Sequence, residues 1–236
     1  MPRGFLMPAH PLPGIDTTIR LLSMQDDQPD STTKRPRGRP RLGPEHRDRV
    51  IAATLELLEE QGSQGLQARL IARRAGLSVG SLYKLVGDVE EIAREANLRT
   101  FRELFDILVA ALRAAEGASL HRQLMALSRA YLDFVQAHPR RMEAVITFRH
   151  TTGEPPDWYQ KAEDDLFAIL EDRLSELPGA RDREQRFVAA RAVWAAVHGI
   201  VTVTPLGSRA EDPLEDAVRQ LELILKGVER ELAVGN

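Results

Sequence analysis

Cysteine is absent from this 236-residue chain, aromatic residues make up only 5% of it, and long apolar runs are missing. Without cysteine the protein forms no disulfide, no thiolate metal site and no cysteine nucleophile, and nothing points to an oxidising compartment. Residues 1–24 contain prolines and charges throughout and lack the apolar core of a signal peptide. The most apolar stretch, residues 192–203, contains His198 and is too short to cross a membrane. We therefore expect a cytoplasmic protein with no membrane association.

Charge is unevenly distributed along the chain, although the net charge is only -3. Residues 34–87 carry 11 basic and 5 acidic side chains, whereas residues 88–236 carry 19 basic and 26 acidic ones. A small basic module on a larger acidic body is typical of a nucleic-acid-binding protein with a separate regulatory or assembly domain. A chance fluctuation of surface charge is the alternative explanation at this point.

Two segments precede the first predicted helix. Residues 1–33 are rich in proline, aspartate and serine and lack hydrophobic periodicity, so we expect a disordered N-terminal tail. Residues 34–43 form a basic arm, in which Arg37, Arg39 and Arg41 are separated by proline and glycine and stay extended. Arginine is attracted to the negative potential of a narrow minor groove, and "RGRPR" resembles the AT-hook core that binds A/T-rich DNA. We predict minor-groove contacts by these arginines, with a solvated basic linker as the alternative.

The stretch "RRAGLSVGSLYKLVGD" admits two incompatible interpretations. Gly76, Ser78 and Gly80 match the pattern Gly-x-Ser-x-Gly, which in hydrolases places a nucleophilic serine on a turn between a strand and a helix. The preceding "LQARLIARRA" has a period near 3.6 residues, which indicates a helix, and no aspartate and histidine follow as evident partners. We therefore predict a turn between two helices with Ser78 as a helix cap, no catalytic residue and no enzymatic activity.

A helix-turn-helix arrangement accounts for this region. The apolar positions from Pro44 onward predict an amphipathic helix that Gly62 ends, followed by a short helix that Gly76 ends in a left-handed conformation. A third helix, the recognition helix, is predicted from Val79 to about Val86. The domain is predicted to span residues 44–89. Its expected small core consists of Ile71, Ala72, Ala75, Leu77 and Leu82.

The segment "RVIAATLELLEEQG…LQARLIARRAGLSVGSLYKLVGDVEEI" resembles the N-terminal domain of the TetR family of bacterial transcriptional regulators. The resemblance implies a three-helix DNA-binding domain, an all-helical C-terminal domain that dimerises and encloses a ligand pocket, and repression relieved by a small molecule. The partner it implies for the first domain is a double-stranded DNA operator. Carried over by position, the phosphate contacts are Ser81 and Tyr83, and the positions facing the bases are Val79, Gly80 and Lys84.

Three departures from the family pattern matter. Gln67 stands where a threonine usually caps the second helix, Val86 stands where an aromatic residue is usual, and Val89 replaces a lysine. Loss of that lysine removes one phosphate contact, so operator affinity is expected to depend more on the basic arm. The same departures leave an alternative open, a helical dimer of this family that binds a ligand or partner but has weak or lost DNA binding.

Residues 90–236 are predicted to form a helical effector-binding and dimerisation domain, so the predicted fold class is all-α. The first helix of this domain connects it to the DNA-binding domain and is expected to transmit effector binding. The segment 183–203 is apolar nearly all round and must be covered, so we expect a homodimer through the last two helices. Its "WAAVHG" resembles the Trp-x-x-x-His-Gly signature of one TetR-family C-terminal domain type. Helices are expected at residues 90–115, 120–137, 139–148, 158–177, 183–203 and 213–232.

A ligand site is predicted around Trp194 and His198, which are four residues apart on one helix face. Aromatic residues of this kind could line a cavity, although they more often form plain core. No second ligand stands at metal spacing from His198, so neither a metal nor a cofactor is predicted. We predict a small hydrophobic or aromatic effector with a polar group near His198. The other candidate ligand-binding residues are Tyr131, Phe134, Phe148 and Trp158.

Overall fold

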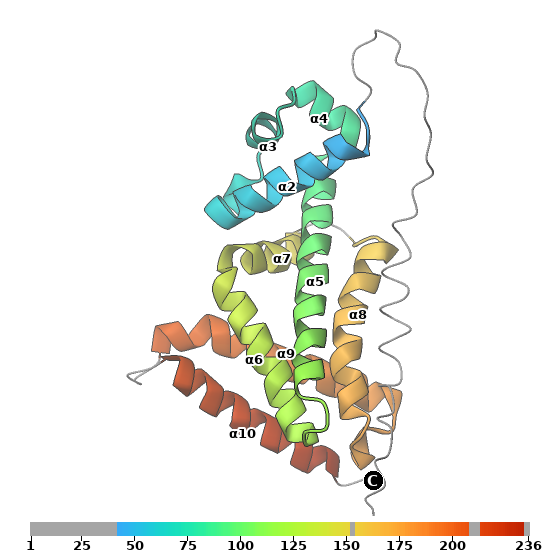
Figure 1. Cartoon of the computed structure of the whole chain (residues 1–236), viewed down its shortest axis with the longest axis vertical. Coiled ribbons are helices and arrows are strands. Elements are labelled where there is room, and N and C mark those ends of the chain that lie inside the picture. Colours follow the sequence, from blue (N-terminus) through green and yellow to red (C-terminus); the bar gives the residue numbers. More distant parts are fainter. Residues whose placement is uncertain (1–41, 152–153, 208–212, 234–236) are drawn as a thin grey trace, which may run out of the picture. The chain divides into compact units, whose positions relative to one another are not determined.

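The computed structural model describes residues 42–151, 154–207 and 213–233 of the chain (Figure 1). These residues form nine α-helices and two short 3-10 helices, and the described part contains no strand. The prediction of an all-α protein is confirmed. The predicted tail, residues 1–33, and the arginines of the basic arm lie outside the described residues.

The first three described helices form the compact N-terminal group in Figure 1. They are α2 (Pro44–Gln61), α3 (Ala68–Arg74) and α4 (Val79–Val86), and α2 contacts both of the others. Between α3 and α4, Gly76 has a φ of 71°, a left-handed conformation that is costly for residues with a side chain. The predicted helix-turn-helix is confirmed, and the predicted bounds of its third helix are those observed.

An apolar core holds these three helices together. Ile71, Ala72, Ala75 and Leu82 are buried in one cluster with residues of α2, and Leu77 packs against the cluster while partly buried. These are the residues that hydrophobic periodicity predicts. Truncating a buried leucine or isoleucine to alanine costs about 2–5 kcal/mol, so burial is the main force that fixes α4 against the rest of the group.

The long helix α5 (Val89–Ala114) leads out of the N-terminal group. The carboxylate of Asp88 caps it by accepting a hydrogen bond from the Glu91 amide at 2.7 Å. Buried residues recur every three or four positions from Ile92 to Leu112, as in an amphipathic helix. Because α5 contacts α2 and α4 as well as α6, α7 and α8, it connects the N-terminal group to the other helices, as predicted (Figure 1).

Three helices pack against α5. They are α6 (Leu120–Ala137), α7 (Pro139–Thr151) and α8 (Asp157–Leu174). The bounds predicted for α6 are exact, but the prediction for α8 was wrong at its C-terminal end, where it ran to Leu177. The chain tightens there, since the Leu177 amide bonds to the carbonyl of Leu174, three residues back.

The last two helices, α9 (Arg183–Gly207) and α10 (Pro213–Ala233), pack against each other and against α6. Leu221 and Leu225 of α10 are fully buried, so one face of α10 covers α9 within the same chain. The homodimer that sequence analysis predicts through these two helices remains a prediction.

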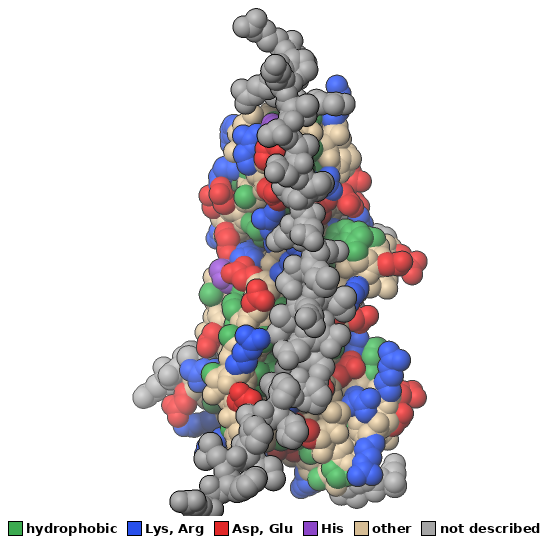
Figure 2. All heavy atoms as spheres, turned by 45° about the vertical axis from the view of Figure 1, so that its right-hand side comes forward, with side chains coloured by type: hydrophobic (Ala, Val, Ile, Leu, Met, Phe, Trp, Pro, Cys, Tyr) green, Lys and Arg blue, Asp and Glu red, His purple; other side chains and the backbone are tan. Residues whose placement is uncertain are grey.

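Charged side chains of both signs are interspersed over the face of the molecule that Figure 2 displays. Within the described ranges, no helix combines the length and the apolarity that a bilayer crossing requires.

Candidate nucleic-acid interface and ligand cavity

The outer face of α4 is open to solvent. Val79 and Tyr83 are 37% and 46% exposed, and Gly80 and Lys84 are also exposed. Lys84 forms no ion pair with any described residue, so its charge is available to an external anion. The hydroxyl of Ser81, half-buried, lies 2.8 Å from that of Ser78. All five predicted recognition-helix residues therefore lie on one short helix, and four of them are exposed.

Gly80 leaves room above the α4 backbone. A Cβ atom built at this position would meet no heavy atom within 4 Å, so packing inside the chain does not require glycine here. The missing side chain instead lets a large external surface approach the backbone closely. A nucleic-acid groove is one such surface.

The opposite side of α4 is held by burial, by a cap and by one arginine. Leu82 is buried. The hydroxyl of Ser78 caps the helix by accepting a hydrogen bond from the backbone amide of Ser81 at 3.1 Å. From α2, Arg47 donates to the carbonyl of Leu85 at 2.9 Å and forms two hydrogen bonds with Glu95 of α5. The hydrogen bonding to Glu95 raises the pKa of Arg47. The charged guanidinium of Arg47 therefore joins α2, α4 and α5, and it fixes the orientation of the C-terminal end of α4.

Two arginines of α3 belong to the same surface and were missed by sequence analysis. Arg69 and Arg73 are exposed, four residues apart, and neither forms an ion pair with a described residue. Arg74 differs, because Glu56 and Glu60 bind it. The spacing of four residues and the lack of an acidic residue three or four positions away on α3 could have identified Arg69 and Arg73 as free cations.

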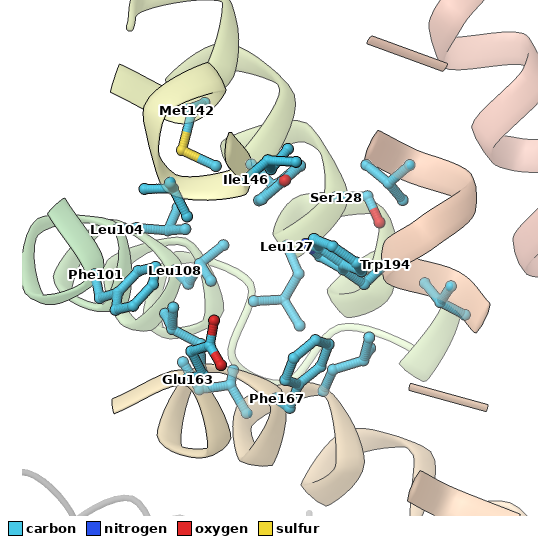
Figure 3. Close-up of a pocket in the computed structure, with 17 residues that line it drawn as sticks. Phe101, Leu104, Leu108, Leu127, Ser128, Met142, Ile146, Glu163, Phe167 and Trp194 are labelled. Atoms are coloured by element: carbon cyan, nitrogen blue, oxygen red, sulfur yellow. The ribbon is translucent and has the colours of Figure 1, made fainter. Parts of the chain in front are cut away.

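A second feature is a cavity of about 120 Å³ among α5, α6, α7, α8 and α9 (Figure 3). Its wall is mainly aliphatic and aromatic. Ser128 and Glu163 add polar oxygen atoms to it. In an otherwise apolar site, a few such groups fix the orientation of a ligand.

Two of the predicted ligand-binding residues, Tyr131 and Trp194, line this cavity. His198 lies behind them rather than in the wall. Its Nδ1 is 2.9 Å from the hydroxyl of Tyr131, and its ring stacks on that of Trp194 with centroids 5.5 Å apart. Burial lowers the pKa of His198 and raises the pKa of Tyr131, so both are neutral at pH 7.

The other three candidates lie elsewhere. Phe134 is buried with its ring 4.9 Å from that of His138 and 5.8 Å from the guanidinium carbon of Arg141. Phe148 packs on a buried cluster shared by α2, α5 and α7. Trp158 is 37% exposed at the start of α8. Aromatic character alone could not distinguish these positions, because aromatic residues occur in the cavity wall, in solid core and at the surface of this protein.

Several lining residues were not predicted. Phe101 of α5, together with Glu163 and Phe167 of α8, contributes to the wall. The apolar stripe of α5 was visible in the sequence, but whether a stripe faces a cavity or solid core depends on the packing of five helices. The hydrophobic periodicity of a single helix does not predict how the five helices pack together.

One helix is shared by the cavity and the N-terminal group. On one side, the start of α7 reaches the end of α2, where Arg141 lies 3.6 Å from the carboxylate of Glu59. His138, the residue before α7, hydrogen bonds to the same carboxylate. Arg141 also binds Thr100 and Glu103 of α5. The residues that α7 contributes to the cavity wall are Met142, Val145 and Ile146.

Two family models match the chain. The bacterial regulatory proteins of the tetR family match residues 50–85, and the tetracyclin repressor-like C-terminal domain matches residues 124–227. The chain belongs to the TetR family. It is a DNA-binding transcriptional regulator and not an enzyme.

Two curated transcriptional regulators resemble it over about two thirds of its length. An uncharacterised HTH-type transcriptional regulator from Mycobacterium tuberculosis is 27% identical over 161 residues, which are 68% of this chain and 71% of that protein. The HTH-type transcriptional regulator BetI from Escherichia coli (strain K12) is 28% identical over 164 residues, 68% of this chain and 84% of BetI.

Solved structures share the fold. A protein of unknown function from Rhodococcus sp. RHA1 has a TM-score of 0.64 at 22% identity, over 80% of this chain and 95% of that one. A putative transcriptional regulator from Pseudomonas aeruginosa PAO1 has a TM-score of 0.59 at 24% identity, over 81% of this chain and 96% of that one.

The departures from the TetR pattern have local structural counterparts. Gln67 is the N-cap of α3 but makes no capping hydrogen bond, and its amide instead donates to the carbonyl of Gln64 at 3.1 Å. Val86 is buried, so the position usually held by an aromatic residue still contributes to the core. Val89, the first residue of α5, packs partly buried against the same core. Two of the three departures therefore leave the packing of this TetR domain intact.

Proposed function

We propose that the protein is a homodimeric repressor that a small hydrophobic or aromatic effector releases from a palindromic operator. The observation that carries this proposal is the position of α7, which lines the cavity with Met142 and Val145 and places Arg141 3.6 Å from the carboxylate of Glu59 of α2. A ligand that shifts α7 changes the support of the helix against which α4 packs. We divide the chain into a DNA-binding domain at residues 44–89 and an effector and dimerisation domain at residues 90–236.

On DNA, two copies of α4 related by a two-fold axis would lie in successive major grooves. Val79, Gly80 and Lys84 are proposed to face the bases, and Ser81 and Tyr83 to contact phosphates. The exposure of four of these residues supports the assignment. The adjoining minor groove is proposed to receive Arg37, Arg39 and Arg41. Because the operator DNA is in the bacterial cytoplasm, the protein is proposed to be cytoplasmic.

Dimerisation is proposed to use the outer faces of α9 and α10. Leu223 is 74% exposed although it lies between the buried Leu221 and Leu225, so α10 carries apolar side chains on two faces. On α9, Phe187 and Val188 are also exposed. In an isolated chain these apolar side chains stay in contact with water and contribute no stabilisation, whereas packing against a second copy would bury them.

Effector binding is proposed to occur in the cavity against Tyr131 and Trp194, with His198 holding Tyr131 from behind. Both α5 and α7 connect this wall to α2. An effector that fits only one arrangement of these helices shifts the population of α4 positions toward one that no longer matches two grooves.

A mobility-shift and footprinting experiment tests the proposal with DNA from upstream of the protein's own gene. We expect a retarded complex with two protected half-sites about one helical turn apart. Hydrophobic and aromatic compounds that raise the melting temperature of the protein should release this complex. Absence of a complex under all salt conditions would instead favour a helical dimer with weak or lost DNA binding.

A further inference from the structure

The exposed residues of α4 form two neighbouring columns on its outer face. Val79 and Tyr83 are four residues apart and make up one column, and Gly80 and Lys84 make up the other. The opposite side of the helix is turned toward the core, where Leu82 is fully buried. The two columns are therefore the part of α4 that an external partner contacts most fully.

The two columns offer different chemical groups. Val79, 37% exposed, offers only methyl groups at the N-terminal end of α4. Lys84 offers an ammonium group that forms no ion pair with any described residue. A helical side chain leans toward the N-terminus of its helix, so Lys84 extends across the turn that contains Gly80. A Cβ atom at Gly80 would meet no heavy atom within 4 Å, and without a side chain there the path of the ammonium group to a base edge is open.

The edges of the bases differ in the major groove. Guanine presents two acceptors, which suit lysine or arginine, and thymine presents a methyl group, which suits an apolar side chain. Adenine is recognised by the donor and acceptor of asparagine or glutamine, and the amino group of cytosine by a carboxylate. The sequence of α4, VGSLYKLV, contains no asparagine, glutamine, aspartate or glutamate. Guanine and thymine are therefore the bases that the side chains of α4 can distinguish.

The two hydroxyl groups of α4 do not change this conclusion. A hydroxyl both donates and accepts hydrogen bonds, so it distinguishes the bases poorly. The hydroxyl of Ser81 also lies 2.8 Å from that of Ser78, in a half-buried position. Tyr83 lies one turn after Val79, at the end of its column, where the proposed function assigns it to a phosphate. The selective contacts are thus left to Val79 and Lys84.

We propose that each operator half-site is defined by a guanine that Lys84 contacts and a thymine whose methyl group Val79 contacts. This inference rests on the proposed operator binding and names the bases that the protein selects. The helix rises about 7.5 Å from Val79 to Lys84, and stacked base pairs are about 3.4 Å apart. The two bases therefore lie within about two base pairs of each other, on the same strand or on opposite strands.

Selection from random DNA identifies the half-site. The full chain is incubated with duplexes that contain a random segment longer than two helical turns, and the bound duplexes are recovered and sequenced. We expect an inverted repeat in which each half contains the guanine and the thymine at the stated separation. Replacing the G·C pair by A·T should weaken binding about tenfold. Replacing the thymine by deoxyuridine, which lacks only the methyl group, should weaken binding about fourfold.

Variants of the exposed side chains assign each preference to one residue. Lys84→Met keeps the length of the side chain and should abolish the preference for G·C over A·T, whereas Lys84→Arg should retain it because arginine binds the same acceptors. Val79→Ser should bind thymine and deoxyuridine equally and keep the preference for G·C. As the matched control, Arg73→Gln removes an exposed cation of α3 and should change neither preference.

Affinities are measured by fluorescence anisotropy with labelled duplexes. Low salt concentration keeps the complexes of the weaker variants detectable. Thermal unfolding of each variant checks that the fold is retained, as the exposure of Val79 and Lys84 leads us to expect.

The inference and the proposed function fail differently. If a site is recovered but Lys84→Met weakens binding to all duplexes equally, Lys84 contacts a phosphate, and the proposed half-site is overturned while operator binding stands. The same holds if deoxyuridine at every thymine of the recovered site leaves the affinity of the full chain unchanged, because Val79 then contacts no methyl group. If no sequence is enriched at any salt concentration, the proposed half-site is overturned together with operator binding.

Discussion

The phenol oxygen of Tyr131 and Nδ1 of His198 lie 2.9 Å apart, and this hydrogen bond joins α6 to α9 behind the cavity wall. A neutral imidazole can accept a hydrogen bond from the phenol at this nitrogen, whereas an imidazolium cannot. Because burial lowers the pKa of His198, the accepting form persists below the pH at which an exposed histidine becomes protonated.

Stability should therefore fall on mild acidification. The pKa of His198 is lower in the folded state than the value of about 6.5 for an unfolded chain, so the unfolded state takes up the proton first. The free energy of unfolding decreases as the pH falls below about 6.5, and this contribution stops changing below the folded pKa. Urea unfolding of His198→Gln should show a smaller difference between neutral and acidic pH. His46→Gln serves as the control, and an undiminished difference in His198→Gln would count against the assignment.

Substitutions on the two sides of α4 should separate DNA binding from folding. Lys84→Ala removes an exposed cation that contacts no described carboxylate, so operator binding should weaken by about 1–3 kcal/mol with unchanged stability. Leu82→Ala truncates a fully buried side chain and should lower the free energy of unfolding by about 2–5 kcal/mol. Fluorescence anisotropy with labelled operator and urea unfolding measure the two effects. Equal operator affinity in Lys84→Ala and the unsubstituted protein would remove Lys84 from the interface.

Deletion of residues 34–41 should weaken operator binding and reduce its salt dependence. Each phosphate contact contributes about 0.9 to the slope of log affinity against log salt concentration, so the loss of the arm arginines makes the slope shallower. A salt titration of the deletion variant and the full chain compares the slopes directly. An unchanged slope would show that the arm is a solvated linker.

The carboxylate of Glu59 should be needed for release and not for effector binding. Glu59→Gln weakens the link between α7 and α2 by removing the negative charge that faces Arg141, while the cavity wall is unaltered. With a compound that raises the melting temperature of the protein as the cavity ligand, the affinity of that compound should be unchanged and its effect on operator affinity reduced. Glu56→Gln is the control, because Glu56 binds Arg74 within the DNA-binding domain. Full release in Glu59→Gln would exclude this route of coupling.

Leu223→Arg should convert a dimer to monomers without unfolding the chain. Leu223 is 74% exposed in the single chain, so its replacement disturbs no internal packing, whereas a buried arginine in a dimer interface is strongly unfavourable. Sedimentation velocity measures the mass, and a control substitution, Lys226→Gln, changes the charge of a neighbouring exposed position. A variant that remains dimeric would place the interface on other helices.

Local features of the fold were predictable from the sequence, and their assembly was not. Gly76 and the 3.6-residue period before it sufficed to place α3 and α4, because a turn and two apolar stripes are local properties. The cavity depends on how five helices leave a space, so Trp194 and Tyr131 could be named but Glu163 and Phe101 could not. Phe148 was misplaced for a related reason, since its stripe on α7 faces α2 rather than the cavity.

The proposed coupling between the cavity and α4 also could not be traced from the sequence. Sequence analysis assigned transmission to the helix that begins near residue 90, and α5 does connect the N-terminal group of helices to the other helices. It gave no role to α7, because Glu59 and Arg141 are far apart in the sequence and nothing in either neighbourhood indicates that they meet.

The open space above Gly80 and the solvent-exposed flank of α4 have an evolutionary consequence. Residues at Val79 and Lys84 take no part in holding the helix, so exchanging them leaves folding, assembly and the cavity untouched. Under the proposed function, a few codon changes at these positions would give the chain a new set of target genes and leave its effector cavity as it is.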